Sequence, residues 1–276
     1  MMERGPSSDY VLGSGDVEHE RLIRQAVFLN PLTDRLFREA GIGPGQRVLD
    51  LGSGVGEVAM VAARIVGPAG QVVGIERDPR SIARARSRVA NTGLSNVTFA
   101  QSDLQQLAVD AQFDAVVGRF ILEYLPDPAA VLRTATAKLR PDGVAVFHEP
   151  CWAPSLAVAP DLKLWTACAL LIRESLQRSG ANNEIGLSLH RVFEQAGMPA
   201  PAMRLEIPLG NGPEFSQRIY DMVCALRPRI DELQMDRSAL GDFGTLEGRL
   251  CAEIAEAGSV VPFGVALVGA WARTAS

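Results

Sequence analysis

The stretch RVLDLGSGVGE at residues 47–57 contains the turn that decides the fold. Its first five residues have the apolar character of a buried strand, and residues 57–66 have the pattern of a helix. Gly52, Gly54 and Gly56 lie in between. Glycine permits the positive φ angles of a tight turn and lets a ligand approach the backbone closely. The sequence therefore predicts a strand–loop–helix unit that binds a ligand at its loop.

Short apolar runs alternate with helical patterns on both sides of this unit. Such alternation is typical of strand–helix–strand units around a mostly parallel sheet, so we predict a doubly wound α/β fold. The predicted strands are 47–51, 72–76, 97–101, 113–118, 144–148, 204–207 and 265–271. The predicted helices are 16–29, 57–66, 79–91, 128–139, 159–177, 213–235 and 245–257.

Acidic residues narrow the choice of ligand at the loop. Glu76 ends the second strand, where its carboxylate can accept hydrogen bonds from both hydroxyls of a ribose. Asp50 precedes the first glycine and would repel a dinucleotide pyrophosphate, but not the ammonium and sulfonium groups of S-adenosylmethionine. Glu57 stands where the dinucleotide fingerprint requires its third glycine. These residues favour S-adenosylmethionine as the cofactor.

At this point the sequence resembles the class I S-adenosylmethionine-dependent methyltransferases, in the small-molecule branch related to ubiquinone and menaquinone biosynthesis. DLGSGVG at 50–56 matches the family's first motif, and Glu76 matches its ribose-binding acid. Ser102-Asp103-Leu104 matches the position that holds the adenine, and FDAVVGRFILEYLPDP at 113–128 matches the fourth strand and the loop after it. The resemblance is strong over residues 41–150 and weaker on either side.

The resemblance implies a Rossmann-like seven-stranded sheet in the order 3-2-1-4-5-7-6 with the last strand antiparallel. We expect an N-terminal helical lid at 1–40, the cofactor-binding core at 41–150, a helical substrate-covering region that includes the sixth strand at 151–258, and the final strand at 259–276. The helical region would be an insertion after the fifth strand that covers the ligand crevice.

The resemblance also implies a set of cofactor-binding residues. They are Tyr10, Gln25, Asp50, Gly52, Ser53, Gly54, Glu76, Arg77, Asp103, Leu104, Arg119 and Tyr124. Many relatives have cysteine where this chain has Ser53 and histidine where it has Tyr124. Neither difference removes a group that cofactor binding requires, but the second is expected to alter the contact with the substrate.

Methyl transfer needs positioning more than a catalytic base, because the sulfonium already activates the carbon. If the acceptor is a hydroxyl or a protonated amine, a general base helps. His148 and Glu149 are the candidates, since they end the fifth predicted strand and are expected to face the crevice. One of them could instead point into a helix interface and make a structural hydrogen bond. His19 and His190 are weaker candidates.

The region after the fifth strand is expected to recognise the acceptor. Its large apolar residues could line a pocket or simply form core: Trp152, Leu156, Leu164, Trp165, Leu170, Phe215, Tyr220, Met222 and Phe243. An apolar pocket of this kind would suit a small, partly apolar metabolite.

Composition limits the remaining partners. The net charge of -5 provides no general attraction for nucleic acid or an anionic membrane, and we expect neither as a partner. Five arginines at 77, 80, 84, 86 and 88 crowd one predicted helix, which we interpret as a solvated face. The 4 cysteines and 3 histidines show no metal-ligand spacing, so no metal is predicted. We expect a cytoplasmic protein, because the first residues lack the apolar segment of a signal peptide. A monomer or a homodimer is expected.

Other functions stay open at this stage. A nicotinamide-dependent oxidoreductase would share the ribose carboxylate but conflicts with Asp50 and Glu57. A non-catalytic S-adenosylmethionine-binding protein would bind the cofactor without transferring the methyl group. A methyltransferase acting on RNA or protein has only the arginine-rich helix in its favour.

Overall fold

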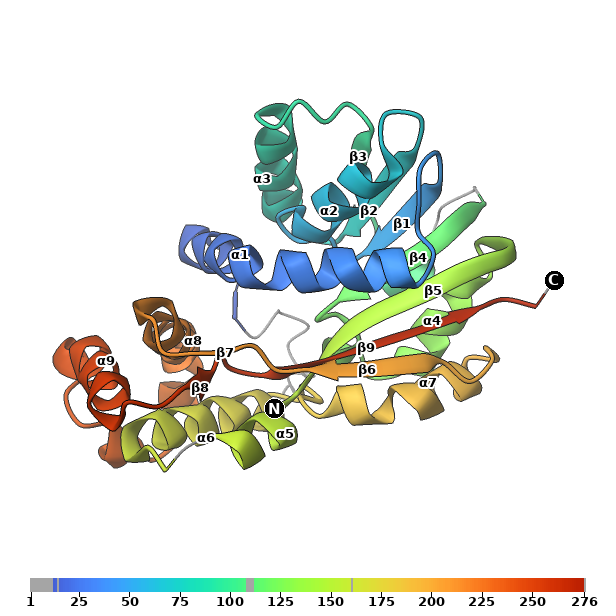
Figure 1. Cartoon of the computed structure of the whole chain (residues 1–276). Coiled ribbons are helices and arrows are strands. Elements are labelled where there is room, and N and C mark those ends of the chain that lie inside the picture. Colours follow the sequence, from blue (N-terminus) through green and yellow to red (C-terminus); the bar gives the residue numbers. More distant parts are fainter. Residues whose placement is uncertain (1–11, 14, 108–111, 160, 276) are drawn as a thin grey trace, which may run out of the picture.

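The computed structural model describes residues 12–13, 15–107, 112–159 and 161–275, and its centre is a seven-stranded sheet (Figure 1). The strands are β1 Arg47–Leu51, β2 Gln71–Glu76, β3 Val97–Gln101, β4 Phe113–Arg119, β5 Leu139–Cys151, β6 Ala202–Glu206 and β9 Ala266–Arg273. They lie in the order β3-β2-β1-β4-β5-β9-β6, and β9 runs antiparallel to both of its neighbours. The predicted Rossmann-like fold and strand order are confirmed, with β9 in the place of the seventh strand.

Helices cover both faces of the sheet (Figure 1). They are α1 Asp16–Glu39, α2 Glu57–Val66, α3 Pro79–Ala90, α4 Pro128–Thr136, α5 Trp152–Val158, α6 Lys163–Arg178, α7 Leu189–Gln195, α8 Pro213–Glu232 and α9 Leu246–Ala257. One apolar core joins α2, α3 and the end of α1 to one sheet face. A second core joins α4 and α7 to the other face, where the Phe147 and Phe193 rings meet edge to face.

The helices α5, α6, α8 and α9 form a third core beyond the carboxyl ends of β4 and β5 (Figure 1). Leu29 of α1 belongs to this core, whereas Leu36 and Phe37 of the same helix belong to the core above the sheet. The helix α1 therefore joins the sheet to the helical region. A small antiparallel pair, β7 Leu209–Gly210 and β8 Val261–Pro262, also lies here and was missed by the sequence pattern.

Two elements are longer than predicted. The helix α1 runs through Pro31 to Glu39, because Leu36 and Phe37 extend its buried face beyond the proline. The strand β5 continues to Cys151, because β9 pairs with it as far as the Cys151–Ala266 register. His148 and Glu149 therefore lie within the strand and not at its end.

The arginine-rich helix α3 uses its guanidinium groups within the protein. Arg84 pairs with Glu20 and Arg88 with Glu57, while Arg86 donates to the carbonyl oxygen of Phe99 at 2.8 Å. Arg80 contacts Asp78 at the start of the helix. Arg84, Arg86 and Arg88 thus connect α3 to neighbouring elements.

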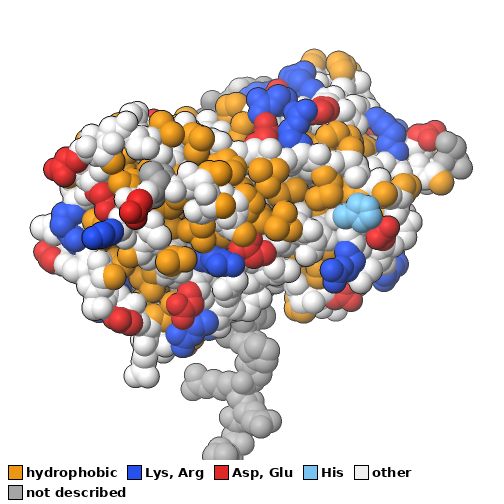
Figure 2. Space-filling view, turned by 60° about the horizontal axis from the view of Figure 1, so that its bottom comes forward, with side chains coloured by type: hydrophobic (Ala, Val, Ile, Leu, Met, Phe, Trp, Pro, Cys, Tyr) orange, Lys and Arg blue, Asp and Glu red, His pale blue; other side chains and the backbone are white. Residues whose placement is uncertain are grey.

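Apolar side chains gather on the face that carries α5, α6 and α7 (Figure 2). Among the large residues exposed on these elements and the turn before α7 are Val158, Leu170 and Leu187. Leu170 therefore faces solvent, although the sequence suggested it as a pocket residue. Within the described ranges, no helix is both long and apolar enough to cross a membrane. The same ranges hold no group of three or more candidate metal ligands.

Candidate active site

The loop between β1 and α2 adopts a conformation that requires glycine. Gly52, Gly54 and Gly56 have φ angles of 64°, 51° and 85°. A Cβ atom on Gly52 would also lie 2.4 Å from Cδ1 of Ile121, which comes from the loop after β4. By contrast, a Cβ on Gly54 would meet open space. The loop thus leaves room for a ligand at Gly54.

Glu76 ends β2 and holds this loop through its carboxylate. Oε2 accepts a hydrogen bond from the Gly54 amide at 2.9 Å. Oε1 accepts from the amides of Arg77 at 2.8 Å and Asp78 at 3.0 Å. The carboxylate is therefore fixed beside Gly54, while the side chain of Arg77 itself is exposed.

Asp103 follows β3, the strand next to β2. Its Oδ1 accepts from the Gln105 amide at 2.8 Å and begins a short 3-10 helix, η1 Leu104–Gln106. Leu104 is half-buried, and Asp103 is exposed. The amide of Ser102 donates to the carbonyl oxygen of Glu76 at 3.1 Å, so these two strand ends are tied together.

Asp50 is fully buried between β2 and β4, in register with Gly74 and Val117. Neither of its carboxylate oxygens has a hydrogen-bond partner among the described residues, and the same holds for Oγ of Ser53. Burial raises the pKa of Asp50 to about 8, although the positive charge of Arg119 and the nearby backbone N–H of Ala59 oppose this shift. Buried polar atoms without partners are rare, and a bound ligand is one way to supply the partners.

Arg119 ends β4 and points toward α1. Its Nη1 donates to Oδ1 of Asn30 at 3.0 Å and to Oγ1 of Thr33 at 2.9 Å. Nδ2 of Asn30 donates in turn to Oε2 of Glu57 at 2.9 Å, directly after the glycine loop. Burial lowers the pKa of Arg119 to about 10, but the group keeps its positive charge near neutral pH.

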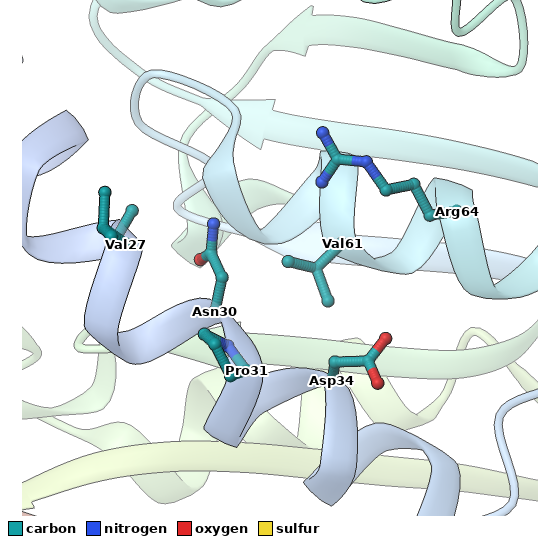
Figure 3. A pocket seen from close by; sticks show the side chains of 7 residues that line it. Val27, Asn30, Pro31, Asp34, Val61 and Arg64 are labelled. Carbon is teal, nitrogen blue, oxygen red and sulfur yellow. The ribbon is translucent and has the colours of Figure 1, made fainter. Parts of the chain in front are cut away.

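A surface pocket of about 300 Å³ lies on the outer side of this network, between α1 and α2 (Figure 3). Its lining residues are Ala26, Val27, Asn30, Pro31, Asp34, Val61 and Arg64. The pocket is separate from the glycine loop, and we assign no role in methyl transfer to it.

His148 faces α1. Its Nδ1 lies 3.2 Å from Oγ1 of Thr33, and only 1% of the residue is exposed. Burial and the charges of Arg119 and Arg35 lower the pKa of His148 to about 3, so its ring is neutral.

Glu149 points to the opposite side of β5 and holds the loop after β4. Its Oε1 accepts from the amides of Ile121 and Leu122, both at 3.1 Å, and Oε2 accepts from the Glu123 amide at 3.3 Å. This contact anchors the short 3-10 helix η2 Leu122–Tyr124. Burial raises the pKa of Glu149 to about 7, while the three amides oppose the shift. A role for His148 or Glu149 as a base stays a prediction.

The helix α1 also carries a buried polar cluster, of which the sequence pattern predicted only Gln25. Nε and Nη2 of Arg21 both donate to the Glu18 carboxylate at 2.6 Å, and Nη1 donates to Oε1 of Gln25 at 2.9 Å. The charge of Arg21 also acts on the buried Glu123, whose pKa is raised well above its usual value mainly by burial. The spacing of 18, 21 and 25 on one helix face was the available signal.

The other residues that the sequence suggested for the site lie in several different parts of the fold. Gln25 was expected near the cofactor and is the partner of Arg21 described above. Tyr124 is half-buried in η2, next to the third core. Tyr10 lies outside the described residues. His190 is on the surface of α7 beside Glu194, and His19 is buried with its Nε2 3.1 Å from Oγ of Ser81.

The fold and the loop define the class of protein as a class I S-adenosylmethionine-dependent methyltransferase. The family model described as a methyltransferase domain matches residues 42–197, and the chain belongs to this family. Its glycine loop, buried Asp50 carboxylate and Glu76 fit S-adenosylmethionine, which is the cofactor.

Two curated relatives match part of the chain. Arsenite methyltransferase of Halobacterium salinarum is 36% identical over 105 residues, which are 38% of this chain and 27% of that protein. Ubiquinone/menaquinone biosynthesis C-methyltransferase UbiE of Ectopseudomonas mendocina is 35% identical over 116 residues, which are 40% of this chain and 45% of that protein. The chain thus spans less than half the length of these relatives.

A solved structure is similar over most of the chain. Phospholethanolamine N-methyltransferase 2 of Haemonchus contortus, in complex with phosphomonomethylethanolamine and S-adenosylhomocysteine, matches with a TM-score of 0.56 and 16% identity. The match covers 89% of this chain and 53% of that one. At this identity the likeness shows the fold alone.

Proposed function

We propose that the chain transfers the methyl group of S-adenosylmethionine to an oxygen, nitrogen or carbon atom of a small, partly apolar metabolite. The observation that carries the proposal is the buried Asp50 carboxylate beside the glycine loop, which has no partner among the described residues. A positively charged ligand end would supply the missing partner. The loop opens at the carboxyl edge of the sheet, where α/β folds bind their ligands.

Each part of the cofactor then has a matching residue. The Glu76 carboxylate would accept hydrogen bonds from the ribose hydroxyls, and Asp103 with the Leu104 amide would hold the adenine. The methionine end would lie near Asp50 and Arg119. Gly52, Ser53 and Gly54 would contact it through the loop, and Arg77, Tyr124, Gln25 and Tyr10 complete the predicted set.

The acceptor would bind between α1 and the helical region. Phe28 of α1 stacks on Phe263 at 4.2 Å between ring centroids, and Phe215 of α8 packs edge-on against both rings. The guanidinium of Arg218 lies over the Phe263 ring, 6.0 Å from its centroid, and its charge acts on the buried Glu123. An apolar wall with a few polar groups is typical of small-molecule sites, which supports a metabolite as the acceptor.

When bound, S-adenosylmethionine supplies a methyl carbon that its sulfonium has already activated. The protein's residues would then position the acceptor for in-line displacement and exclude water. The contacts of His148 with Thr33 and of Glu149 with the η2 amides favour positioning roles for both residues. Their proposed roles as bases would apply only to an acceptor that must lose a proton.

Radiolabelled S-adenosylmethionine and a metabolite extract test this function. We expect the wild-type protein to move label into the small-molecule fraction, and Glu76→Gln to abolish the transfer. Glu174→Gln is the matched control, because Glu174 is exposed on α6. Label in the protein or RNA fraction would contradict the proposed acceptor. Cofactor binding without transfer of label would indicate a binding protein, and binding of NADH without S-adenosylmethionine would indicate an oxidoreductase.

A further inference from the structure

The seven-stranded sheet ends at β6, and the outer edge of this strand is open (Figure 1). Among the described strands, β6 pairs only with β9, so the outward backbone groups of Ala202–Glu206 have no strand beside them. An open edge is a template for pairing with another chain, and proteins often block it with proline or lysine. Residues 202–207 contain neither residue type. The edge can therefore accept a partner strand.

Apolar side chains are exposed along this edge, on the side of the sheet that carries α7. Met203 pairs with Ala270 of β9, and Leu205 pairs with Val268. Both β9 residues belong to the core between the sheet and α7, and paired residues point to the same face of a sheet. Nevertheless, Met203 and Leu205 are 39% and 46% exposed. They form an apolar rim on that core.

The turn before α7 adds a third exposed apolar residue on the same side. Leu187 follows Gly186, where an added Cβ atom would lie 2.7 Å from Cγ2 of Val268. Leu187 itself is 59% exposed. Exposed apolar residues that gather in one place are typical of an interaction surface. Met203, Leu205 and Leu187 are called the edge strip below.

The opposite face of β6 carries one positive and one negative charge. Arg204 pairs with Glu39 of α1 at 2.6 Å, and Glu206 pairs with Arg35 of the same helix. The side chains of Arg204 and Glu206 are still 36% and 20% exposed. Both charges can therefore also meet charges of a second molecule.

A second copy of the chain fits this pattern. A two-fold axis perpendicular to the sheet makes two copies of β6 antiparallel and keeps each face on its own side, so it passes beside a single residue. With the axis at Leu205, Arg204 lies opposite the partner subunit's Glu206, and Met203 lies opposite the partner subunit's Ile207. An axis at Arg204 or Glu206 would place like charges opposite each other, and an axis at Met203 would pair neither charge. Charge complementarity thus selects the register centred on Leu205.

We propose that the chain forms a homodimer in which two copies of β6 pair in this register, so that one sheet runs through both subunits. Main-chain hydrogen bonds join the two edges, as in other cases of strand addition. The edge strips of the two subunits pack together on one face, and the charges of Arg204 and Glu206 alternate on the other. A two-fold contact of this kind closes after two copies.

This interface is separate from the glycine loop. The loop follows β1, and the strands β4, β5 and β9 lie between β1 and β6. The inference therefore goes beyond the proposed function and does not depend on it. A monomeric variant should still bind the cofactor.

Sedimentation velocity of the full chain over a range of protein concentrations tests the dimer. We expect a monomer–dimer equilibrium for the wild-type protein. Leu205→Lys places two ammonium groups opposite each other at the axis and should raise the Kd of the dimer by about tenfold or more. Leu170→Lys is the matched control, because Leu170 is 47% exposed on α6, away from the edge. It should leave the Kd unchanged.

A cysteine at the axis tests the register. The Cβ atoms of directly opposite residues are about 4.5–5.5 Å apart, close to the separation that a disulfide spans. Leu205→Cys should therefore form a covalent dimer under mild oxidation, whereas the wild-type protein and Leu170→Cys should not. The wild-type control is needed because Cys251 is exposed.

A wild-type chain that stays monomeric at every concentration would overturn the inference. So would a dimer that Leu170→Lys dissociates and Leu205→Lys does not, since the interface would then lie on the helical face. Calorimetry with S-adenosylhomocysteine shows whether each variant is folded, and the cysteine test decides if Leu205→Lys is not. Failure of the wild-type protein to bind this ligand would contradict the proposed function and leave the interface standing.

Discussion

Nδ1 of His148 lies 3.2 Å from Oγ1 of Thr33, so the histidine of β5 faces α1 across a buried interface. Arg119 donates to the same hydroxyl oxygen at 2.9 Å. A protonated imidazolium would therefore stand beside a positive charge in a buried place, where only 1% of His148 is exposed. His148 serves as a neutral, packed partner of α1.

The low pKa of His148 predicts how stability depends on pH. The ring titrates at about 3 in the folded protein and at about 6.5 in an unfolded chain. Below pH 6.5 the unfolded chain therefore binds a proton that the folded protein does not, and the free energy of unfolding falls by up to about 1.4 kcal/mol per pH unit.

His148→Asn removes this titration. We expect urea unfolding at several pH values between 4 and 7 to show a shallower loss of stability for the variant than for wild type. His190→Asn, on the exposed surface of α7, should follow the wild-type curve. Identical pH slopes for wild type and His148→Asn would show that the histidine is protonated in the folded state.

Glu149 should be a stabilising residue of the loop after β4. Glu149→Ala leaves the amides of Ile121, Leu122 and Glu123 without their acceptor. We expect a loss of about 2–4 kcal/mol in the free energy of unfolding, since several buried donors lose their partner. Glu194→Ala, an exposed glutamate, should change it by less than about 0.5 kcal/mol. Similar small effects for both variants would contradict the anchoring role.

Alanine at Gly54 separates backbone strain from contact with the cofactor. Gly54 and Gly258 have φ angles of 51° and 58°, and a Cβ on either meets open space in the protein. Gly54→Ala and Gly258→Ala should therefore lose similar stability, about 1–2 kcal/mol. Only Gly54→Ala should weaken binding of S-adenosylmethionine, by more than tenfold by calorimetry, because the added methyl group fills the space for the ligand. Equal affinities in the two variants would place the cofactor elsewhere.

Cofactor binding should release a proton from Asp50. Without a ligand the pKa of this carboxyl is about 8, so the group is largely protonated at pH 7. An ammonium partner favours the carboxylate and lowers the pKa, so affinity should rise with pH until about pH 8 and then level off. Calorimetry in buffers of different ionisation enthalpy measures the released proton. In Asp50→Asn binding should be weaker and release no such proton, and an unchanged release would assign the proton to another group.

The sequence predicted the fold well because the central strands are buried on both faces. The apolar runs around Leu49, Val116 and Val146 differ clearly from the helical patterns beside them. The glycine loop was also predictable, since positions with positive φ angles favour glycine, and the glycines are visible in the sequence. The length of α1 was underestimated because Pro31 indicated a helix end. The helix continues beyond the proline because its later residues are buried by tertiary packing.

The direction of side chains in β5 was harder to predict. Successive residues of a strand point to opposite faces, so His148 and Glu149 could not both face one crevice. Their partners, Thr33 and the η2 amides, come from distant parts of the chain. The same reason explains why the contact between Asn30 and Arg119 was missed, since it joins residues 89 positions apart.

A crystal structure of the complex with S-adenosylhomocysteine tests the central claim most directly. The account predicts that the ribose hydroxyls contact the Glu76 carboxylate and that the amino-acid end lies between Asp50 and Arg119, above the glycine loop at 52–56. A ligand bound away from this loop, or one whose ribose does not reach Glu76, would contradict it.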